Sequence, residues 1–148
     1  MQCQNFNEDW TFEKANQADR LKAFYGNSNA VAVTLPHDAM IREKRDKDCP
    51  SGAQSGFYPG GVYTYEKKFM AQNEWKKQDV FLEFEGIYGI ARVWINGALA
   101  AVNRNGYMGF SVDLKPWISY ENENIIRIDV DNSKQPNSRW YSGSGIYR

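Results

Sequence analysis

The chain has 148 residues, of which 42% are hydrophobic and 24% are charged, and its formal net charge at pH 7 is zero. This length and composition are typical of one globular domain with its own core, and they exclude an intrinsically disordered chain. Because a neutral domain has no electrostatic attraction to phosphate backbones or anionic lipid, and no apolar run approaches the roughly 20 residues of a membrane span, neither nucleic acid nor a membrane is an expected partner.

Alternating apolar and polar residues predict short β-strands along most of the chain. In chain order, the predicted strands are 10–15, 30–36, 62–71, 80–87, 90–102 and 124–132. The run 90–102 is interrupted by Asn96-Gly97, which predicts a type I′ hairpin turn because both residues tolerate positive φ angles. Short strands with one apolar face predict an all-β fold, an antiparallel β-sandwich.

Helical signals are weak by comparison. Residues 17–25 predict at most a turn or two of helix, and residues 113–118 predict a single turn interrupted at Pro116. The longest connector, 37–61, has no pattern of its own, which is typical of a functional or mobile loop.

Few side chains offer catalytic chemistry. His37 is the single histidine and precedes Asp38, but neighbours in sequence point in different directions, so we expect a loop histidine with local hydrogen bonds. Glu83 and Glu85 lie roughly 7 Å apart along a strand, a separation found in inverting glycosidases. Because the two would face the same way rather than flank a bond, we expect a solvated strand face. No catalytic residue is predicted in this chain.

Metal chemistry has one candidate. Asp129, Asp131 and Asn132 carry oxygen ligands suited to calcium, although solvated charges on the outer face of a strand are the favoured explanation. The cysteines, Cys3 and Cys49, fit no metal motif and no disulfide framework. No metal site and no cofactor is predicted, and the sequence leaves open whether calcium binds and whether the cysteines pair.

Aromatic residues make up 15% of the chain and gather in two places. Phe57, Tyr58 and Tyr63 surround the glycines that end the long connector, and Trp140, Tyr141 and Tyr147 lie near the C-terminus. A flat ring suits the C–H face of a sugar, while Asn, Asp and Arg suit its hydroxyls. Aromatic rings in loops at one end of a sandwich therefore favour carbohydrate binding, with core packing as the alternative.

Six segments, taken in order, resemble one family. They are "NFNEDWTF" (5–12), "VTLPHD" (33–38), "GFYPGGVYTYEKKF" (56–69), "FEGIYGIARVWINGALAAVNRNGYMGFSVDL" (84–114), "NIIRIDVDN" (124–132) and "SRWYSGSGIYR" (138–148). Together they are similar to the N-terminal sugar-binding domain of glycoside hydrolase family two, which includes β-galactosidases, β-glucuronidases and β-mannosidases. The resemblance implies a jelly-roll β-sandwich, galactose-binding-domain-like, in which residues 1–148 are a single domain.

The resemblance also implies what lies elsewhere in the protein. The family continues into an immunoglobulin-like sandwich and a TIM barrel, and the barrel carries the two glutamates of a retaining mechanism. We therefore expect a fragment of a β-glycosidase, foremost a β-galactosidase, whose partners are a carbohydrate substrate and the downstream domains. Assembly into a homo-oligomer is a further expectation. The alternatives are a β-glucuronidase or β-mannosidase, a free-standing carbohydrate-binding module, and a purely structural domain.

Site residues follow from the family pattern, position by position. Where the well-known β-galactosidases have a sugar-binding aspartate, this chain has Arg139, and residues 48–51 hold no asparagine where the family has one. Both departures argue against strict β-galactosidase specificity, because a guanidinium only donates hydrogen bonds. "SRWY" is similar to secreted or periplasmic bacterial members, which predicts that compartment. Arg139, Trp140 and Tyr141 are the predicted substrate-binding residues, unless Arg139 instead pins the loop through a carboxylate such as Asp131.

Overall fold

The structure is a computed structural model that describes residues 2–15, 29–134 and 143–148. Its strands are β1 (Trp10–Ala15), β2 (Val31–Val33), β3 (Gly61–Phe69), β4 (Phe81–Phe84), β5 (Ile87–Tyr88), β6 (Ile90–Ile95), β7 (Ala98–Asn103), β8 (Phe110–Asp113), β9 (Asn124–Asn132) and β10 (Gly145–Ile146). The helices of the described residues are short 3₁₀ segments, η2 (Gly52–Ser55) and η3 (Asn73–Lys77). Neither is long or apolar enough to cross a membrane.

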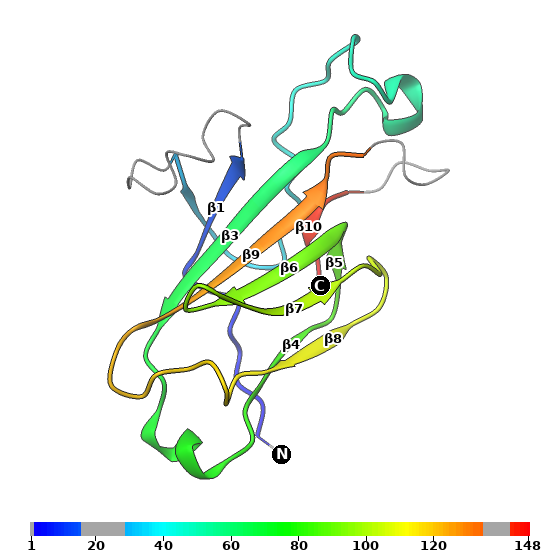
Figure 1. The fold of residues 1–148 in the computed structure, drawn as a ribbon. Coiled ribbons are helices and arrows are strands. Elements are labelled where there is room, and N and C mark those ends of the chain that lie inside the picture. The colour runs from blue at the N-terminus through cyan, green and yellow to red at the C-terminus, as the bar shows by residue number, and fades with distance from the viewer. Residues whose placement is uncertain (1, 16–28, 135–142) are drawn as a thin grey trace.

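The strands form two layers around one core (Figure 1). Six of them make an antiparallel sheet in the order β2-β1-β3-β9-β6-β7, and the pairs β4–β8 and β5–β10 make two smaller antiparallel sheets. Leu82 and Phe84 of β4 and Val112 of β8 are buried in the same cluster as the inward side chains of the large sheet. The predicted all-β sandwich is therefore confirmed.

The central strands β3 and β9 show why this sequence forms a sheet. They pair along their whole length, from Gly61 opposite Asn132 to Phe69 opposite Asn124. Alternation along β9 places Ile126, Ile128 and Val130 on the inner face, where all three are fully buried. Fully burying one such side chain contributes about 1.5–3 kcal/mol, so the apolar face of β9 fixes the register of the sheet.

The hairpin predicted at Asn96-Gly97 is present between β6 and β7. Both turn residues have positive φ, 50° for Asn96 and 83° for Gly97, as the dipeptide predicts. The Asn96 side chain also accepts a hydrogen bond from the Ile125 amide and donates one to the Trp117 carbonyl, each 2.9 Å long. The turn therefore holds the neighbouring β8–β9 connection as well as its own strands.

Two predicted strands differ most in extent from the structure. The run 80–87 divides into β4 and β5, because the backbone of Gly86 leaves the line of β4 to accept from the Tyr147 amide and donate to the Arg148 carbonyl. Residues 30–36 hold only the short β2, and the Leu35 amide beyond it donates to the Asn7 carbonyl instead of extending the pairing with β1. The strands β8 and β10 were not predicted, because they have only four and two residues.

The remaining predictions concern turns, loops and cysteines. The segment 17–25 lies outside the described residues. A single turn does occur in 113–118, where the amides of Trp117 and Ile118 donate to the Leu114 carbonyl. Cys3 is exposed and Cys49 is buried, and neither forms a disulfide.

Candidate functional site

The end of β9, the start of β10 and the loop between β2 and β3 lie at one end of the large sheet (Figure 1). The predicted substrate-binding residues Arg139, Trp140 and Tyr141 lie outside the described residues. Described residues nevertheless flank them on both sides, at Lys134 and Gly143. The described part of the candidate site therefore consists of the other side chains at this end of the sandwich.

The β2–β3 loop is closed upon itself by a small polar cluster. The Ser55 hydroxyl donates to the Tyr58 carbonyl over 2.9 Å and also pairs with the Ser51 hydroxyl. Ser51 in turn lies 3.6 Å from the buried Cys49 thiol. Because these contacts join the residues on both sides of η2, this part of the loop is held in shape by its own hydrogen bonds.

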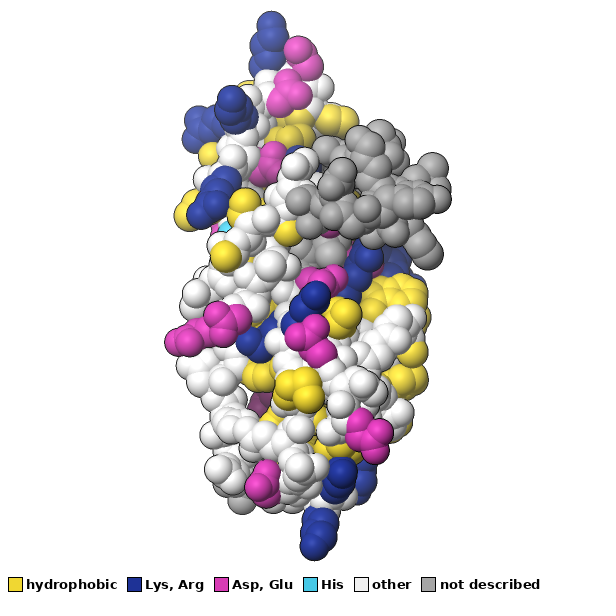
Figure 2. Space-filling view, turned by 90° about the vertical axis from the view of Figure 1, so that its left-hand side faces the viewer, with side chains coloured by type: hydrophobic (Ala, Val, Ile, Leu, Met, Phe, Trp, Pro, Cys, Tyr) yellow, Lys and Arg dark blue, Asp and Glu magenta, His cyan; other side chains and the backbone are white. Residues whose placement is uncertain are grey.

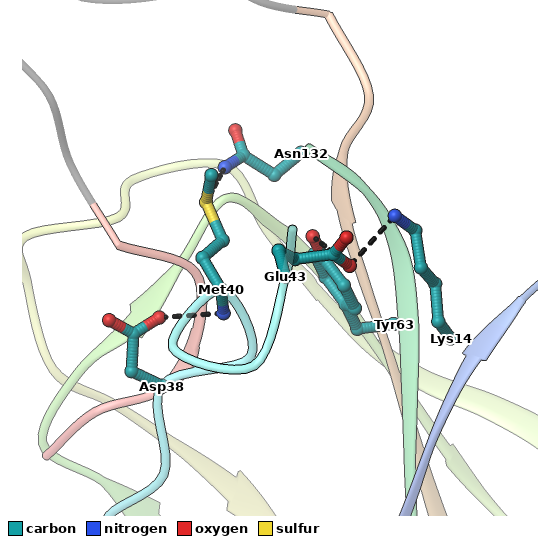
Figure 3. Close-up of polar contacts among 6 residues, drawn as sticks. All are labelled: Lys14, Asp38, Met40, Glu43, Tyr63 and Asn132. Atoms are coloured by element: carbon teal, nitrogen blue, oxygen red, sulfur yellow. Dashed lines mark hydrogen bonds and ion pairs between the residues drawn. The ribbon is translucent and has the colours of Figure 1, made fainter. Parts of the chain in front are cut away.

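A carboxylate from this loop meets the end of the sheet (Figure 3). Glu43 lies 2.7 Å from the ammonium of Lys14, at the end of β1, and accepts a 3.4 Å hydrogen bond from the Tyr63 hydroxyl of β3. Tyr63 is fully buried, and burial together with the Glu43 charge raises the pKa of its phenol well above the usual range. The phenol therefore stays protonated and donates to the partly buried Glu43, which also pairs with the Lys14 ammonium.

Asp38 performs a second task at the same end. Its Oδ1 accepts from the backbone amides of Met40, 2.9 Å away, and Ser144, 3.1 Å away. The backbone continues this contact, because the His37 amide donates to the Ile146 carbonyl and the Ala39 amide donates to the Ser144 carbonyl. The segment 37–39 thus lies beside β10 like a further strand, with Asp38 fastening its end.

His37 and Asp38 point to different partners, as their adjacency in sequence predicts. The His37 ring packs against Phe12 and contacts the Tyr65 hydroxyl through Nδ1 at 2.9 Å. Its Nε2 is buried and meets no hydrogen-bond partner among the described residues. Burial, followed by the charge of Arg42, lowers the pKa of His37 despite the opposing effect of Asp38. The imidazole is therefore held neutral as part of the packing.

Asn132, the last residue of β9, is buried below the loop. Its exposed fraction is 1%, and its side-chain amide contacts the Met40 sulfur at 3.8 Å (Figure 3). Asp131 points to the opposite face, where burial would raise its pKa, but hydrogen bonds from Ser133 and the charge of Arg92 outweigh burial and lower it. The three residues considered for calcium therefore do not converge.

The outer face of β9 gives a second reason against that calcium site. Asp129 accepts a 2.9 Å hydrogen bond from the Thr64 hydroxyl and a 3.0 Å hydrogen bond from Arg127 Nε. Arg92 lies 3.8 Å from Asp131. Both carboxylates are thus already matched with donors and cations, and no group of three or more acidic, histidine or cysteine side chains suited to a metal occurs in the described ranges.

The aromatic residues singled out from the sequence divide between surface and core. Phe57 is 39% exposed, with a positive φ of 66°, whereas Tyr63 is fully buried. Tyr58 is half-buried beneath the Arg45 guanidinium, 5.7 Å from its ring centre. Tyr147 donates to the Gly106 carbonyl over 2.8 Å. Core packing therefore explains Tyr63, and among these four described rings only Phe57 is exposed at the loop end.

Charge is mixed over the face that includes the loop. Figure 2 shows acidic and basic side chains interspersed, with Lys and Arg side chains reaching outward at the upper end, where Figure 1 places the β2–β3 loop. The loop alternates both signs through Arg42, Glu43, Lys44, Arg45, Asp46, Lys47 and Asp48. Glu83 and Glu85, considered as a carboxylate pair, are both exposed, as expected for a solvated strand face.

Sequence reasoning missed the anchors of this site. Lys14 meets Glu43, and Asp38 meets Ser144, only through the fold. Glu43 lies in a run of charges that by itself indicates a solvated loop, so no local signal distinguished it. The one available hint was Asp38, whose short side chain next to a turn is typical of a backbone-capping residue.

Comparisons with known proteins place these features in context. Residues 10–142 match the family described as glycosyl hydrolase 2 galactose-binding domain-like. The chain is 38% identical to a beta-galactosidase from Bacteroides ovatus, over 97% of this chain and 17% of that protein. It is 30% identical to a putative beta-glucuronidase from Formosa agariphila, over 97% of this chain and 14% of that protein.

Solved structures show the same relation. A glycosyl hydrolase family 2 member from Bacteroides cellulosilyticus superposes with a TM-score of 0.87 at 32% identity, over 98% of this chain and 19% of that one. A beta-glycosidase from Bacteroides vulgatus superposes with a TM-score of 0.85 at 37% identity, over 97% of this chain and 19% of that one. The fold is therefore the galactose-binding-like sandwich, and the chain spans less than a fifth of these relatives.

Proposed function

This chain belongs to the galactose-binding-like domains of glycosyl hydrolase family 2, and from that premise we propose that it is the N-terminal domain of a retaining β-glycosidase acting on β-galactosides. The observation that carries the proposal is the match to a beta-galactosidase over 97% of this chain but only 17% of the relative. Residues 1–148 then form one sandwich domain, followed in the intact protein by an immunoglobulin-like domain and a catalytic barrel.

The chemistry of the described residues supports this division of labour. A retaining glycosidase needs two carboxyl groups about 5 Å apart on either side of the scissile bond. Glu83 of β4 and Glu85, directly after it, are exposed, and Glu43 is bound to Lys14 and Tyr63. We therefore assign the acid/base and the nucleophile to the barrel, and assign to this domain the support of the barrel and the completion of its substrate pocket.

The residues proposed to face substrate are Arg139, Trp140 and Tyr141. A guanidinium donates to sugar hydroxyls, and an indole face packs on the C–H face of a pyranose. What supports their role is the way the chain on either side is fastened: Asn132 is buried at the end of β9, and Ser144 is bound through its amide to Asp38.

The test is hydrolysis by the full-length protein of a panel of aryl β-glycosides, including the galactoside, glucuronide and mannoside. We expect cleavage of the β-galactoside with retention of anomeric configuration. Cleavage of the glucuronide alone would keep the class and change the sugar, and no cleavage of any member would overturn the proposal. The 148-residue chain serves as the control, and we expect it neither to cleave these substrates nor to bind galactose in a calorimetric titration.

A further inference from the structure

The loop between β7 and β8 presents two large apolar side chains to solvent. Tyr107 is 66% exposed and Met108 is 64% exposed, although they are neighbours in sequence and neither belongs to a strand. Tyrosine and methionine are enriched at protein interfaces relative to the rest of a protein surface. This pair, called here the Tyr107–Met108 surface, is not explained by the core or by the site at the other loops.

The loop that carries this surface is fixed in place. Asn103 Oδ1 accepts from the Asn105 amide, and Asn105 Oδ1 accepts from the Tyr107 amide, each over 3.0 Å. The Gly106 carbonyl accepts from the Tyr147 hydroxyl over 2.8 Å. Because the backbone is already ordered by these bonds, a partner that covers the loop has little conformational entropy to remove.

Tyr107 packs against the domain on one side, and most of its ring remains exposed. Its ring meets the buried Tyr88 edge-on, with centres 5.4 Å apart, and a hydrogen bond between the two side chains raises the pKa of Tyr107. Gly106 permits this approach, since a Cβ there would overlap the Tyr88 ring. The ring is thus oriented by one contact while most of its area faces outward, as in a surface prepared for a partner.

The last residues of the chain lie directly beside this loop. Besides the bond from Tyr147 to Gly106, the Arg148 carbonyl accepts from the Gly86 amide over 2.9 Å, and its guanidinium donates to the Glu85 carbonyl. Arg148 is therefore held against the β4–β5 junction. A segment that continues from Arg148 leaves the domain next to the Tyr107–Met108 surface.

The geometry points to an interface: we infer that Tyr107 and Met108 are a docking surface for the domain that follows Arg148 in the intact protein. The inference rests on the proposed function, which supplies that following domain. The relatives support it, because they extend well beyond the matched region, which makes up 14–19% of their length. The occupant required is a face that offers apolar side chains to Met108 and an acceptor or ring edge to Tyr107.

The test substitutes Met108→Asp in the full-length protein and, as a matched control, Met70→Asp. Met70 is 58% exposed but follows β3, away from the loop that carries Met108 (Figure 1). Limited proteolysis of the chain just after Arg148 measures how often the two domains separate. An unpaired carboxylate buried in an apolar interface opposes docking, so we expect cleavage to rise about tenfold in M108D and to stay unchanged in M70D.

Further measurements distinguish a docking surface for the following domain from misfolding, self-association and carbohydrate binding. Thermal unfolding of the 148-residue chain should be the same for M108D and the unsubstituted protein, which excludes misfolding as the cause. Equal cleavage of M108D and M70D overturns the docking surface. A change in sedimentation instead of cleavage assigns the surface to a second copy, and a loss of substrate affinity alone assigns it to carbohydrate; each overturns the inference.

Activity of the same preparations keeps the two proposals apart. A full-length protein that cleaves no β-glycoside overturns the proposed function, yet the proteolysis ratio of M108D to M70D still tests the interface. A protein that is active but shows equal cleavage overturns the interface and leaves the proposed function standing. Tyr107→Ser provides a second variant, for which the same direction of change is expected.

Discussion

Two glycines with positive φ angles do the same geometric task in different ways. Gly97, in the β6–β7 hairpin, has φ of 83°, and a Cβ added there would meet nothing within 4 Å. Gly145, at the start of β10, has φ of 108°, and a Cβ there would overlap the Tyr65 hydroxyl and press on the His37 carbonyl. Gly97 is needed only for its backbone conformation. Gly145 is needed for its backbone conformation and also because Tyr65 and His37 leave no room for a side chain.

The β6–β7 hairpin depends on neighbouring residues in the sequence, whereas the β10 junction depends on residues far apart in the chain. The hairpin is formed by consecutive residues and could be recognised from Asn96-Gly97 alone. The junction at β10 is formed by segments from three parts of the chain, namely 37–40, 87–88 and 144–146. We therefore expect substitutions at the junction to cost more than matched substitutions at the hairpin.

The largest effect is expected from Gly145→Ala. The added methyl group cannot be accommodated without moving Tyr65 or the backbone at His37, and the positive φ adds backbone strain. Overpacking and strain of this kind cost about 3 kcal/mol or more together. Urea denaturation of the 148-residue chain measures the change in the free energy of unfolding, and a loss below that of Gly97→Ala would contradict the comparison.

The next effect is expected from Asp38→Ala. Removing the carboxylate leaves the amides of Met40 and Ser144 without their acceptor, which costs about 1–3 kcal/mol. Hydrogen exchange should speed up at both amides while the amides of β9 keep their protection. Asp38→Asn, which keeps an acceptor oxygen, is the matched control and should lose less, and equal losses would show that hydrogen bonding is not the cause.

A smaller effect is expected from Gly97→Ala. Space is open at this position, so only the positive φ opposes a methyl group, at a cost of about 1 kcal/mol. Thermal unfolding by circular dichroism is a sufficient measurement. A loss as large as that of Gly145→Ala would show that the hairpin is as tightly surrounded as the junction.

The smallest effect is a pH dependence from His37. Its pKa is lowered from 6.5 by burial, so the unfolded chain binds a proton before the folded one does. The stabilisation is fully present above pH 6.5 and is lost progressively as the pH falls below it. The effect is expected to be small because the ring is only partly buried. Urea denaturation between pH 5 and 7.5 should show that the free energy of unfolding falls with falling pH in the native chain. The fall should be smaller in His37→Gln, and equal slopes in the two proteins would exclude His37 as its cause.

Much of the sheet could be predicted because its information is local. The strands β1 and β9 have the bounds that alternation indicates, since an apolar face every second residue specifies both the strand and the side that is buried. The strands β8 and β10, of four and two residues, are too short for alternation to identify them. A strand such as Gly145–Ile146 is held by its neighbours, β5 on one side and residues 37–39 on the other, rather than by a pattern of its own.

The candidate site divides along the same line. The loop 37–61, which the sequence singled out, lies beside residues 144–146 at one end of the large sheet, and the predicted substrate-binding residues lie outside the described ones. The sequence did not indicate that Glu43 pairs with Lys14, or that Asp38 holds Ser144, because each contact joins residues far apart in the chain. Tyr63 also shows the limit of composition, since a ring beside a glycine-rich loop proved to be core.

By itself, the amino-acid sequence determined the class of the fold, the central strands, the hairpin at Asn96-Gly97 and, through the ordered motifs, the family. These depend on periodicity and on backbone chemistry that act over a few residues. The tertiary structure alone decided which carboxylates serve as anchors and that Tyr107 and Met108 remain exposed beside Arg148. Those outcomes depend on segments that meet only after the two layers pack, so no local pattern encodes them.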